Sequence, residues 1–112
     1  MKIYHNPRCS KSRQTLQLIK DANKEVEIVE YLNETPTKEE LKDILGKLNL
    51  NAEDILRKGE AVYKENFKGK TLSNDEWIEA MIKHPKLIER PIVVKDNKAV
   101  LGRPPENVLE FL

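Results

Sequence analysis

The spacing of hydrophobic and polar positions changes along the chain and divides it into three parts. A short apolar run at 2–5 (KIYH) is followed by a polar turn and then by Leu16, Ile19 and Ala22, which recur with helical spacing. The segment 25–31 (EVEIVEY) alternates apolar and polar residues, as a half-buried strand does. Strand, helix and strand in this order predict a βαβ unit whose two strands are parallel.

The middle part, over about 37–88, has helical signals. Thr37 precedes Glu40 by three residues, and Ser73 precedes Glu76 by the same distance, which is the spacing of a capping box at a helix start. Behind the first box, apolar residues recur at i, i+3, i+4 and i+7, namely Leu41, Ile44, Leu45 and Leu48. This part therefore predicts a helical insert.

The last part returns to the spacing of strands. The segment 91–102 (PIVVKDNKAVLG) has two apolar runs around an Asp-Asn pair and predicts a β-hairpin. In the segment 103–112 (RPPENVLEFL) the prolines lie near the first turn of an expected helix. The residues of this helix that we expect to face inward are Val108, Leu109 and Leu112.

The order of these elements is βαβ, helical insert and ββα, which predicts an α/β protein with a thioredoxin-like fold and a mixed four-stranded sheet. A length of 112 residues suits a single domain, residues 1–112, with the helical insert at about 37–88. Charged residues make up 35% of the chain but nearly cancel at +1, and aromatic residues are only 5%, which disfavours a nucleic-acid partner. The first residues, MKIYHNP, lack the apolar core of a signal peptide, and no long apolar run follows, so we expect a cytoplasmic monomer without a membrane partner.

The candidate chemistry centres on Cys9, the single cysteine, which lies in the polar turn NPRCSKS where the first helix begins. The N–H groups and the dipole of a helix N-terminus favour a thiolate over a thiol and also bind anions. The alternative is a buried structural cysteine, which is common for an unpaired cysteine. Ser12 stands where a CxxC motif has its second cysteine, so any second thiol must come from another molecule. His5, at the end of the first strand, is either a proton donor to this turn or a structural hydrogen-bonding residue.

Three arginines are candidates for binding a tetrahedral oxyanion: Arg57, Arg90 and Arg103. A guanidinium is planar and permanently charged and binds oxyanions bidentately, although a solvated surface charge is the default for any one arginine. Arg90 and Arg103 each precede a proline, which holds the preceding residue extended and limits where its side chain points. Pro91, at the start of the third expected strand, is a possible cis-proline. The two histidines lie far apart along the chain and, with one cysteine, give no metal-ligand spacing.

Four segments together resemble the glutaredoxin-dependent arsenate reductase family, the ArsC/Spx-like group of the thioredoxin-like superfamily: YHNPRCSKSRQTL, ILRKGE, HPKLIERPIVV and GRPPENVLEFL. They occur in the family's order and extend from about Ile3 to the C-terminus. The resemblance implies that Cys9 is the nucleophile that attacks arsenate, with Ser12 stabilising its thiolate and His5 flanking it. It also assigns the binding of the oxyanion to three residues: Arg57, Arg90 and Arg103.

The same resemblance implies glutathione as co-substrate, glutaredoxin as the final source of reducing thiol, and no bound cofactor. Longer members of the family continue past the position of Leu112, so the chain is most similar to the short members. Two alternatives stay open at this point. One is a glutathione-dependent thiol reductase of unknown substrate. The other is an Spx-like regulator that binds RNA polymerase; such regulators commonly carry CxxC at this turn, and Ser12 argues against that reading.

Overall fold

The computed structural model describes residues 1–112, which form two compact units. One unit contains Met1–Glu34 and Arg90–Leu112, and the other contains Thr35–Glu89. The helices expected over about 37–88 lie in the second unit, while the organisation of the chain as a single domain stays a prediction. None of the helices has the length and apolar character that crossing a membrane requires.

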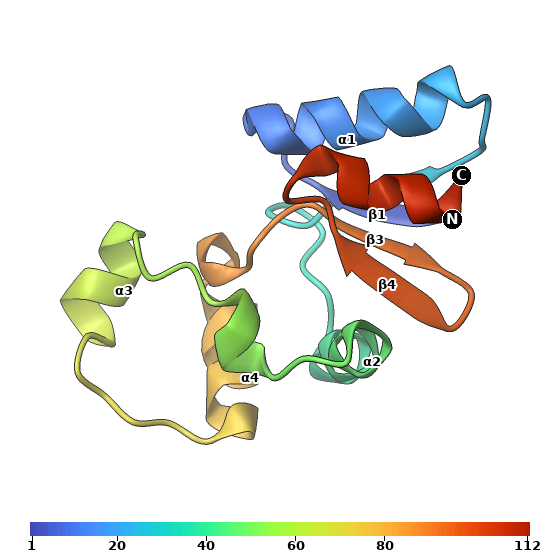
Figure 1. Ribbon diagram of the computed structural model, residues 1–112. Coiled ribbons are helices and arrows are strands. Elements are labelled where there is room, and N and C mark those ends of the chain that lie inside the picture. Colours follow the sequence, from blue (N-terminus) through green and yellow to red (C-terminus); the bar gives the residue numbers. More distant parts are fainter. The chain divides into compact units, whose positions relative to one another are not determined.

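The first unit contains a four-stranded mixed sheet (Figure 1). Its strands are β1 (Lys2–His5), β2 (Glu27–Glu30), β3 (Ile92–Lys95) and β4 (Lys98–Leu101), in the spatial order β2-β1-β3-β4. The strand β1 is parallel to β2 and antiparallel to β3, and β3 is antiparallel to β4. The predicted sheet and its thioredoxin-like topology are therefore confirmed.

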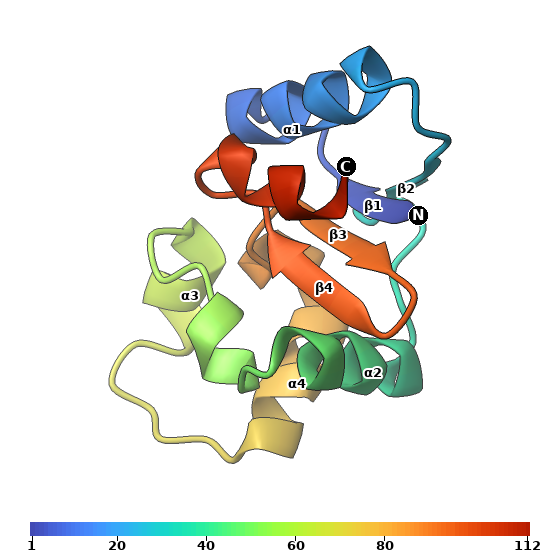
Figure 2. The same cartoon turned by 45° about the vertical axis from the view of Figure 1, so that its right-hand side comes forward.

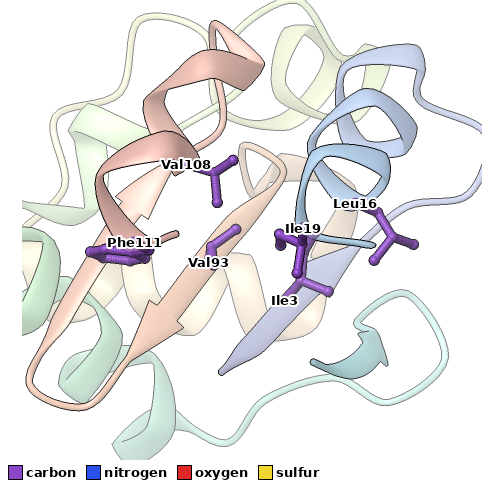
Figure 3. Packing of buried hydrophobic residues seen from close by; sticks show 6 residues of the cluster. All are labelled: Ile3, Leu16, Ile19, Val93, Val108 and Phe111. Carbon is purple, nitrogen blue, oxygen red and sulfur yellow. The ribbon is translucent and has the colours of Figure 1, made fainter. Parts of the chain in front are cut away.

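Two helical segments cover one face of this sheet, α1 (Ser10–Asp21) and the 3₁₀ segment η3 (Pro105–Phe111). They lie side by side in Figures 1 and 2, although they come from opposite ends of the chain. Side chains from the sheet and from both segments form one hydrophobic cluster (Figure 3): Ile3, Leu16, Ile19, Val93, Val108 and Phe111. This cluster packs α1 and η3 against the strands β1 and β3.

The inward face of the C-terminal segment differs from the prediction. Leu109 was expected to face inward but is 53% exposed, whereas Phe111 is only 5% exposed. The reason is the 3₁₀ geometry, which has three residues per turn and brings every third side chain to the same face. Pro105, Val108 and Phe111 follow this period and are all buried.

The second unit is helical. It contains α2 (Lys38–Leu48), η1 (Ala52–Ile55), α3 (Ala61–Asn66), α4 (Asn74–Lys83) and η2 (Pro85–Leu87). Both predicted capping boxes are present, with Thr37 and Glu40 at the start of α2 and Ser73 and Glu76 at the start of α4. The sequence did not predict α3 as an element of its own, because none of its residues is buried and it therefore has no apolar stripe.

Candidate active site

Cys9 is the residue that precedes α1, with an extended backbone conformation (φ −94°, ψ 122°). Asn6 shapes the turn before it: its carbonyl accepts a hydrogen bond from the Cys9 amide at 3.0 Å, and its side chain accepts one from the Arg8 amide at 3.0 Å. The carbonyl of Cys9 accepts the first intrahelical bond, from the amide of Arg13 at 3.0 Å. Local hydrogen bonds therefore hold Cys9 at the N-terminus of α1.

The N-terminus of α1 is suited to a negative charge. The helix is 12 residues long, its first turn contains no acidic residue, and no side chain caps it. The first three amides of a helix have no intrahelical acceptor and point towards its N-terminal end, where the macrodipole is positive. A thiolate on Cys9, or an oxyanion bound beside it, would be stabilised there.

The predicted residues His5 and Ser12 lie together beneath this turn. Nδ1 of His5 is 2.6 Å from the Ser12 hydroxyl, which also accepts a hydrogen bond from the amide of Asn6 at 3.1 Å. Ser12 is fully buried and His5 is 6% exposed. The pair therefore connects the end of β1 to the first turn of α1.

The buried position of His5 affects its charge. Burial lowers the pKa of His5 below its ordinary value; the nearby carboxylate of Glu30 opposes this shift, and the positive charges of Lys20 and Arg13 add to it to a smaller extent. A lowered pKa means that the neutral imidazole is the favoured form near neutral pH. A neutral ring has one protonated nitrogen, so Nδ1 is either a donor or an acceptor towards the hydroxyl.

Ser12 has a single hydroxyl proton, and the structure bonds its hydroxyl group to His5 and Asn6. If Nδ1 of His5 is the acceptor, this proton is already used. If Nδ1 carries a proton and donates it, the oxygen of Ser12 accepts twice and its own proton is available. The expected stabilisation of the Cys9 thiolate by Ser12 thus stays a prediction, and it requires the second arrangement.

Arg103 is the candidate arginine that lies close to the cysteine. Its Nη1 is 3.9 Å from Sγ of Cys9 and donates a hydrogen bond to the carbonyl of Arg90 at 3.3 Å. The Arg90–Pro91 peptide bond is cis, as is the Arg103–Pro104 bond. Although Cys9 is only 9% exposed, its neighbours are a guanidinium and a helix end, and it is outside the main hydrophobic cluster. A cation, a helix N-terminus and a thiol suit nucleophilic attack on an anionic substrate.

Arg57 belongs to the unit Thr35–Glu89 and is described with that unit alone. Its Nη1 is 3.5 Å from a carboxylate oxygen of Glu60, and its Nε is 3.5 Å from one of Glu89. Two carboxylates therefore orient this guanidinium within its own unit. Its expected convergence on Cys9 with the other two arginines stays a prediction.

Sequence reasoning missed three residues that shape this region: Thr15, Gly102 and Asn107. Thr15 is fully buried on α1, and its hydroxyl is 3.3 Å from the carbonyl of Gly102. The side chain of Asn107 donates hydrogen bonds to two carbonyls next to Gly102. A signal for Thr15 was present, because it continues the helical stripe of buried positions, whereas nothing local in the sequence identifies the other two.

The resemblance seen in the sequence extends to known proteins. The chain matches the ArsC family over residues 4–111. It is 50% identical to Uncharacterized protein YfgD of Escherichia coli K12, over 100% of this chain and 96% of that protein. It is 46% identical to an arsenate reductase of Neisseria meningitidis, over 96% of this chain and 94% of that protein. An arsenate reductase structure from Vibrio cholerae, 48% identical, superposes with a TM-score of 0.93 and covers 100% of this chain and 98% of that one. The match spans nearly the whole chain and includes the turn that carries Cys9, so the protein belongs to the ArsC family.

Proposed function

We propose that this protein is an arsenate reductase in which Cys9 is the nucleophile and external thiols supply the electrons. The observation that carries the proposal is the 3.9 Å contact between Nη1 of Arg103 and Sγ of Cys9 at the N-terminus of α1. A cation at this distance would attract an anionic substrate to the sulfur. Relatives named arsenate reductase, of nearly the same length, support the choice of arsenate.

In the first step the thiolate of Cys9 attacks the arsenic atom of arsenate. A sulfur–arsenic bond forms, one arsenic–oxygen bond breaks, and the departing oxygen leaves as water after protonation. The arsenic stays pentavalent. The remaining oxygens keep their negative charge, and Arg103 and the first amides of α1 would hold them, since both are positioned before the substrate arrives. Arg90 and Arg57 are proposed as further oxyanion ligands.

Ser12 and His5 are proposed to regulate the charge of the sulfur. The neutral imidazole can carry its proton on Nδ1 and donate it to Ser12, which releases the hydroxyl proton of Ser12 for the sulfur. The hydroxyl would then stabilise the attacking thiolate, and also the thiolate regenerated when the product leaves. In this arrangement His5 acts through Ser12 and is a positioning residue.

Reduction needs two electrons, and the chain has a single thiol. We propose that the thiolate of glutathione attacks the sulfur-bound arsenic, which forms a second sulfur–arsenic bond and breaks a second arsenic–oxygen bond, with that oxygen leaving as water. The thiolate of glutaredoxin then attacks the sulfur of the bound glutathione, and the electron pair of the breaking sulfur–arsenic bond stays on arsenic. One disulfide forms between these two thiols, the arsenic becomes trivalent, and hydrolysis of the remaining sulfur–arsenic bond releases arsenite and free Cys9. Glutathione is therefore a co-substrate, and no bound cofactor is required.

The test is release of arsenite by the purified protein with arsenate, glutathione, glutaredoxin and a reductase that recycles oxidised glutathione. We expect turnover with the natural chain and none with Cys9→Ala, while both proteins show the same circular dichroism. Absence of turnover by the natural chain would refute the proposal. Reduction of a small disulfide by glutathione under those conditions would favour the thiol reductase, and capture of purified RNA polymerase would favour the regulator.

A further inference from the structure

The segment that carries Arg103 is held at three successive backbone carbonyls. The side-chain amide of Asn107 donates to the carbonyl of Leu101 at 3.1 Å and to that of Arg103 at 3.2 Å. Between them, the hydroxyl of Thr15 lies 3.3 Å from the carbonyl of Gly102, although its shorter hydrogen bond, at 2.8 Å, is to the carbonyl of Lys11 in the same helix. The two hydrogen bonds from Asn107, with the longer contact of Thr15 between them, restrict the path of the backbone from β4 to Arg103.

Gly102 allows this segment to lie against α1. A Cβ atom at this position would lie 2.5 Å from Oγ1 of Thr15 and 2.7 Å from Cγ of Pro91, distances too short for any side chain. The amide of Gly102 also donates to the carbonyl of Pro91 at 2.9 Å. The backbone before Arg103 therefore contacts the helix that positions Cys9 and the residue that follows Arg90.

Asn107 supplies two of the three bonds but is itself exposed, in η3. Its backbone amide donates a third hydrogen bond, to the carbonyl of Pro104 at 3.0 Å. One residue thus contacts the carbonyls of Leu101, Arg103 and Pro104, on both sides of the guanidinium-bearing residue. An exposed asparagine is not needed for the hydrophobic core, so this pattern calls for another explanation.

We propose that Asn107 is a positioning residue that keeps Arg103 within reach of the Cys9 sulfur. The inference rests on the proposed role of Arg103 as an oxyanion ligand and identifies what places it. A long arginine side chain samples many rotamers, and its guanidinium is useful at Cys9 only if the backbone from which it extends is fixed. The two bonds from the Asn107 side chain restrict that backbone without touching the substrate.

The first experiment measures the charge beside Cys9 and needs no arsenate. The rate of alkylation of Cys9 by iodoacetate, which is anionic, is divided by the rate with iodoacetamide, which is neutral. The ratio reports positive charge near the sulfur and cancels changes in thiolate population that affect both reagents. Asn107→Ala should lower this ratio about threefold to tenfold, the factor that matches one or two lost hydrogen bonds, and Arg103→Ala should lower it at least as much.

Two controls separate positioning from a structural role. Leu109→Ala removes an exposed side chain from the same segment and should leave the ratio unchanged. Asn107→Gln keeps the amide and should recover part of the ratio. In the double variant of Asn107→Ala and Arg103→Ala the ratio should fall no further than in Arg103→Ala alone, because both changes remove the same charge from Cys9. An unchanged ratio in Asn107→Ala, or additive losses in the double variant, would overturn the inference.

The second experiment measures arsenate reduction. Asn107→Ala should reduce kcat/KM for arsenate about threefold to tenfold, mainly through KM, because the ligand for the oxyanion is displaced while the nucleophile is intact. If the natural chain does not reduce arsenate, the proposed function fails, whereas the alkylation ratio still decides whether Asn107 positions Arg103. An unchanged kcat/KM in Asn107→Ala, with turnover by the natural chain, would contradict the inference itself.

Discussion

The N-terminus of α1 and the N-termini of α2 and α4 follow opposite rules. Helices α2 and α4 begin with capping boxes, in which Thr37 or Ser73 binds the third amide and Glu40 or Glu76 binds back to the cap. Both have two acidic residues in the first turn, whereas α1 has none and begins at Cys9 without a side-chain cap. The starts of α2 and α4 supply hydrogen-bond acceptors for their own amides and negative charge beside the positive end of the helix dipole. The start of α1 provides neither a side-chain acceptor nor an acidic residue, as the proposed binding of a negative charge there would require.

This difference supports the proposal that the start of α1 is the functional helix end. The chain forms complete capping boxes at the starts of α2 and α4, so the absence of one at the start of α1 is specific to that helix. A helix start without a side-chain cap is less stable than a capped one. Active sites commonly keep such a destabilising feature, because a capping residue would take the position of the reactive residue.

The largest expected effect comes from giving α1 a cap. Cys9→Ser should abolish arsenite release, since a hydroxyl is a far weaker nucleophile than a thiolate. It should also raise the free energy of unfolding by about 0.5–1 kcal/mol, because a serine oxygen at this position can accept a bond from the third amide of the helix. Urea denaturation followed by circular dichroism measures the second effect. A lower unfolding free energy in Cys9→Ser would show that the cysteine itself stabilises the turn.

The next effect comes from adding an acid to the first turn of α1. Lys11 is exposed there, and Lys11→Glu makes this helix end resemble those of α2 and α4. A negative charge close to Cys9 should repel arsenate and reduce kcat/KM about tenfold, while the helix itself is slightly stabilised.

The matched control for that change is Gln14→Glu, about one turn further along α1, where the influence of the helix end has largely decayed. Lys11→Gln should give an intermediate rate, because it removes one charge without adding the opposite one. Equal rates in Lys11→Glu and Gln14→Glu, measured at low ionic strength, would argue that the end of α1 does not bind the substrate.

Removing the caps of the other two helices should affect stability and leave catalysis unchanged. Thr37→Ala or Ser73→Ala should each lower the free energy of unfolding by about 1 kcal/mol, because each leaves an amide of the first turn without its acceptor. Neither residue lies in the unit that contains Cys9, so kcat/KM at a temperature well below the transition should equal that of the natural chain. A loss of activity in a fully folded variant would show that these helix starts contribute to the reaction.

The comparison also shows which parts of this protein can be read from local sequence. The capping boxes, the individual strands and the position of Cys9 at the start of a helix depend on residues within a few positions of each other, and the structure contains all of them. The stripe of buried residues on α1 was only half predicted, because two of its members, Ser12 and Thr15, are polar. Their hydroxyls satisfy partners from other elements, and hydrophobic spacing alone does not reveal such partners.

Other features depend on contacts between distant segments. Arg103 lies next to Cys9 because η3 and α1 pack together on the same sheet, and no local pattern encodes that proximity. Phe111 is buried and Leu109 is exposed because the segment that contains them forms a 3₁₀ helix, with three residues per turn. In both cases tertiary packing determines where the side chain lies. The sequence therefore identified the candidate residues but not their positions in space.

The smallest expected effect is a pH dependence at the start of α4 that comes from a carboxylate, a group that the first turn of α1 lacks. Glu76 accepts a hydrogen bond from the amide of Ser73 at 2.9 Å, and this bond, together with that to the Ser73 side chain, lowers the pKa of Glu76 below its ordinary value. The folded protein therefore holds this proton less tightly than the unfolded chain does. The resulting stability is fully present above the ordinary pKa of a glutamate and is lost as the pH falls through the lowered value.

The corresponding third residue of α1 is Ser12, whose hydroxyl does not titrate and is bonded to His5. We therefore expect the difference in unfolding free energy between the natural chain and Glu76→Gln to shrink as the pH is lowered below the ordinary pKa of a glutamate. Ser12→Ala provides the comparison, since its difference from the natural chain should not follow the same carboxylate titration. Urea denaturation at a series of pH values measures both. If the difference in unfolding free energy between Glu76→Gln and the natural chain stays constant as the pH falls, the charged carboxylate does not stabilise the start of α4. The contrast between the capped helix ends and the start of α1 would then rest on hydrogen bonding alone.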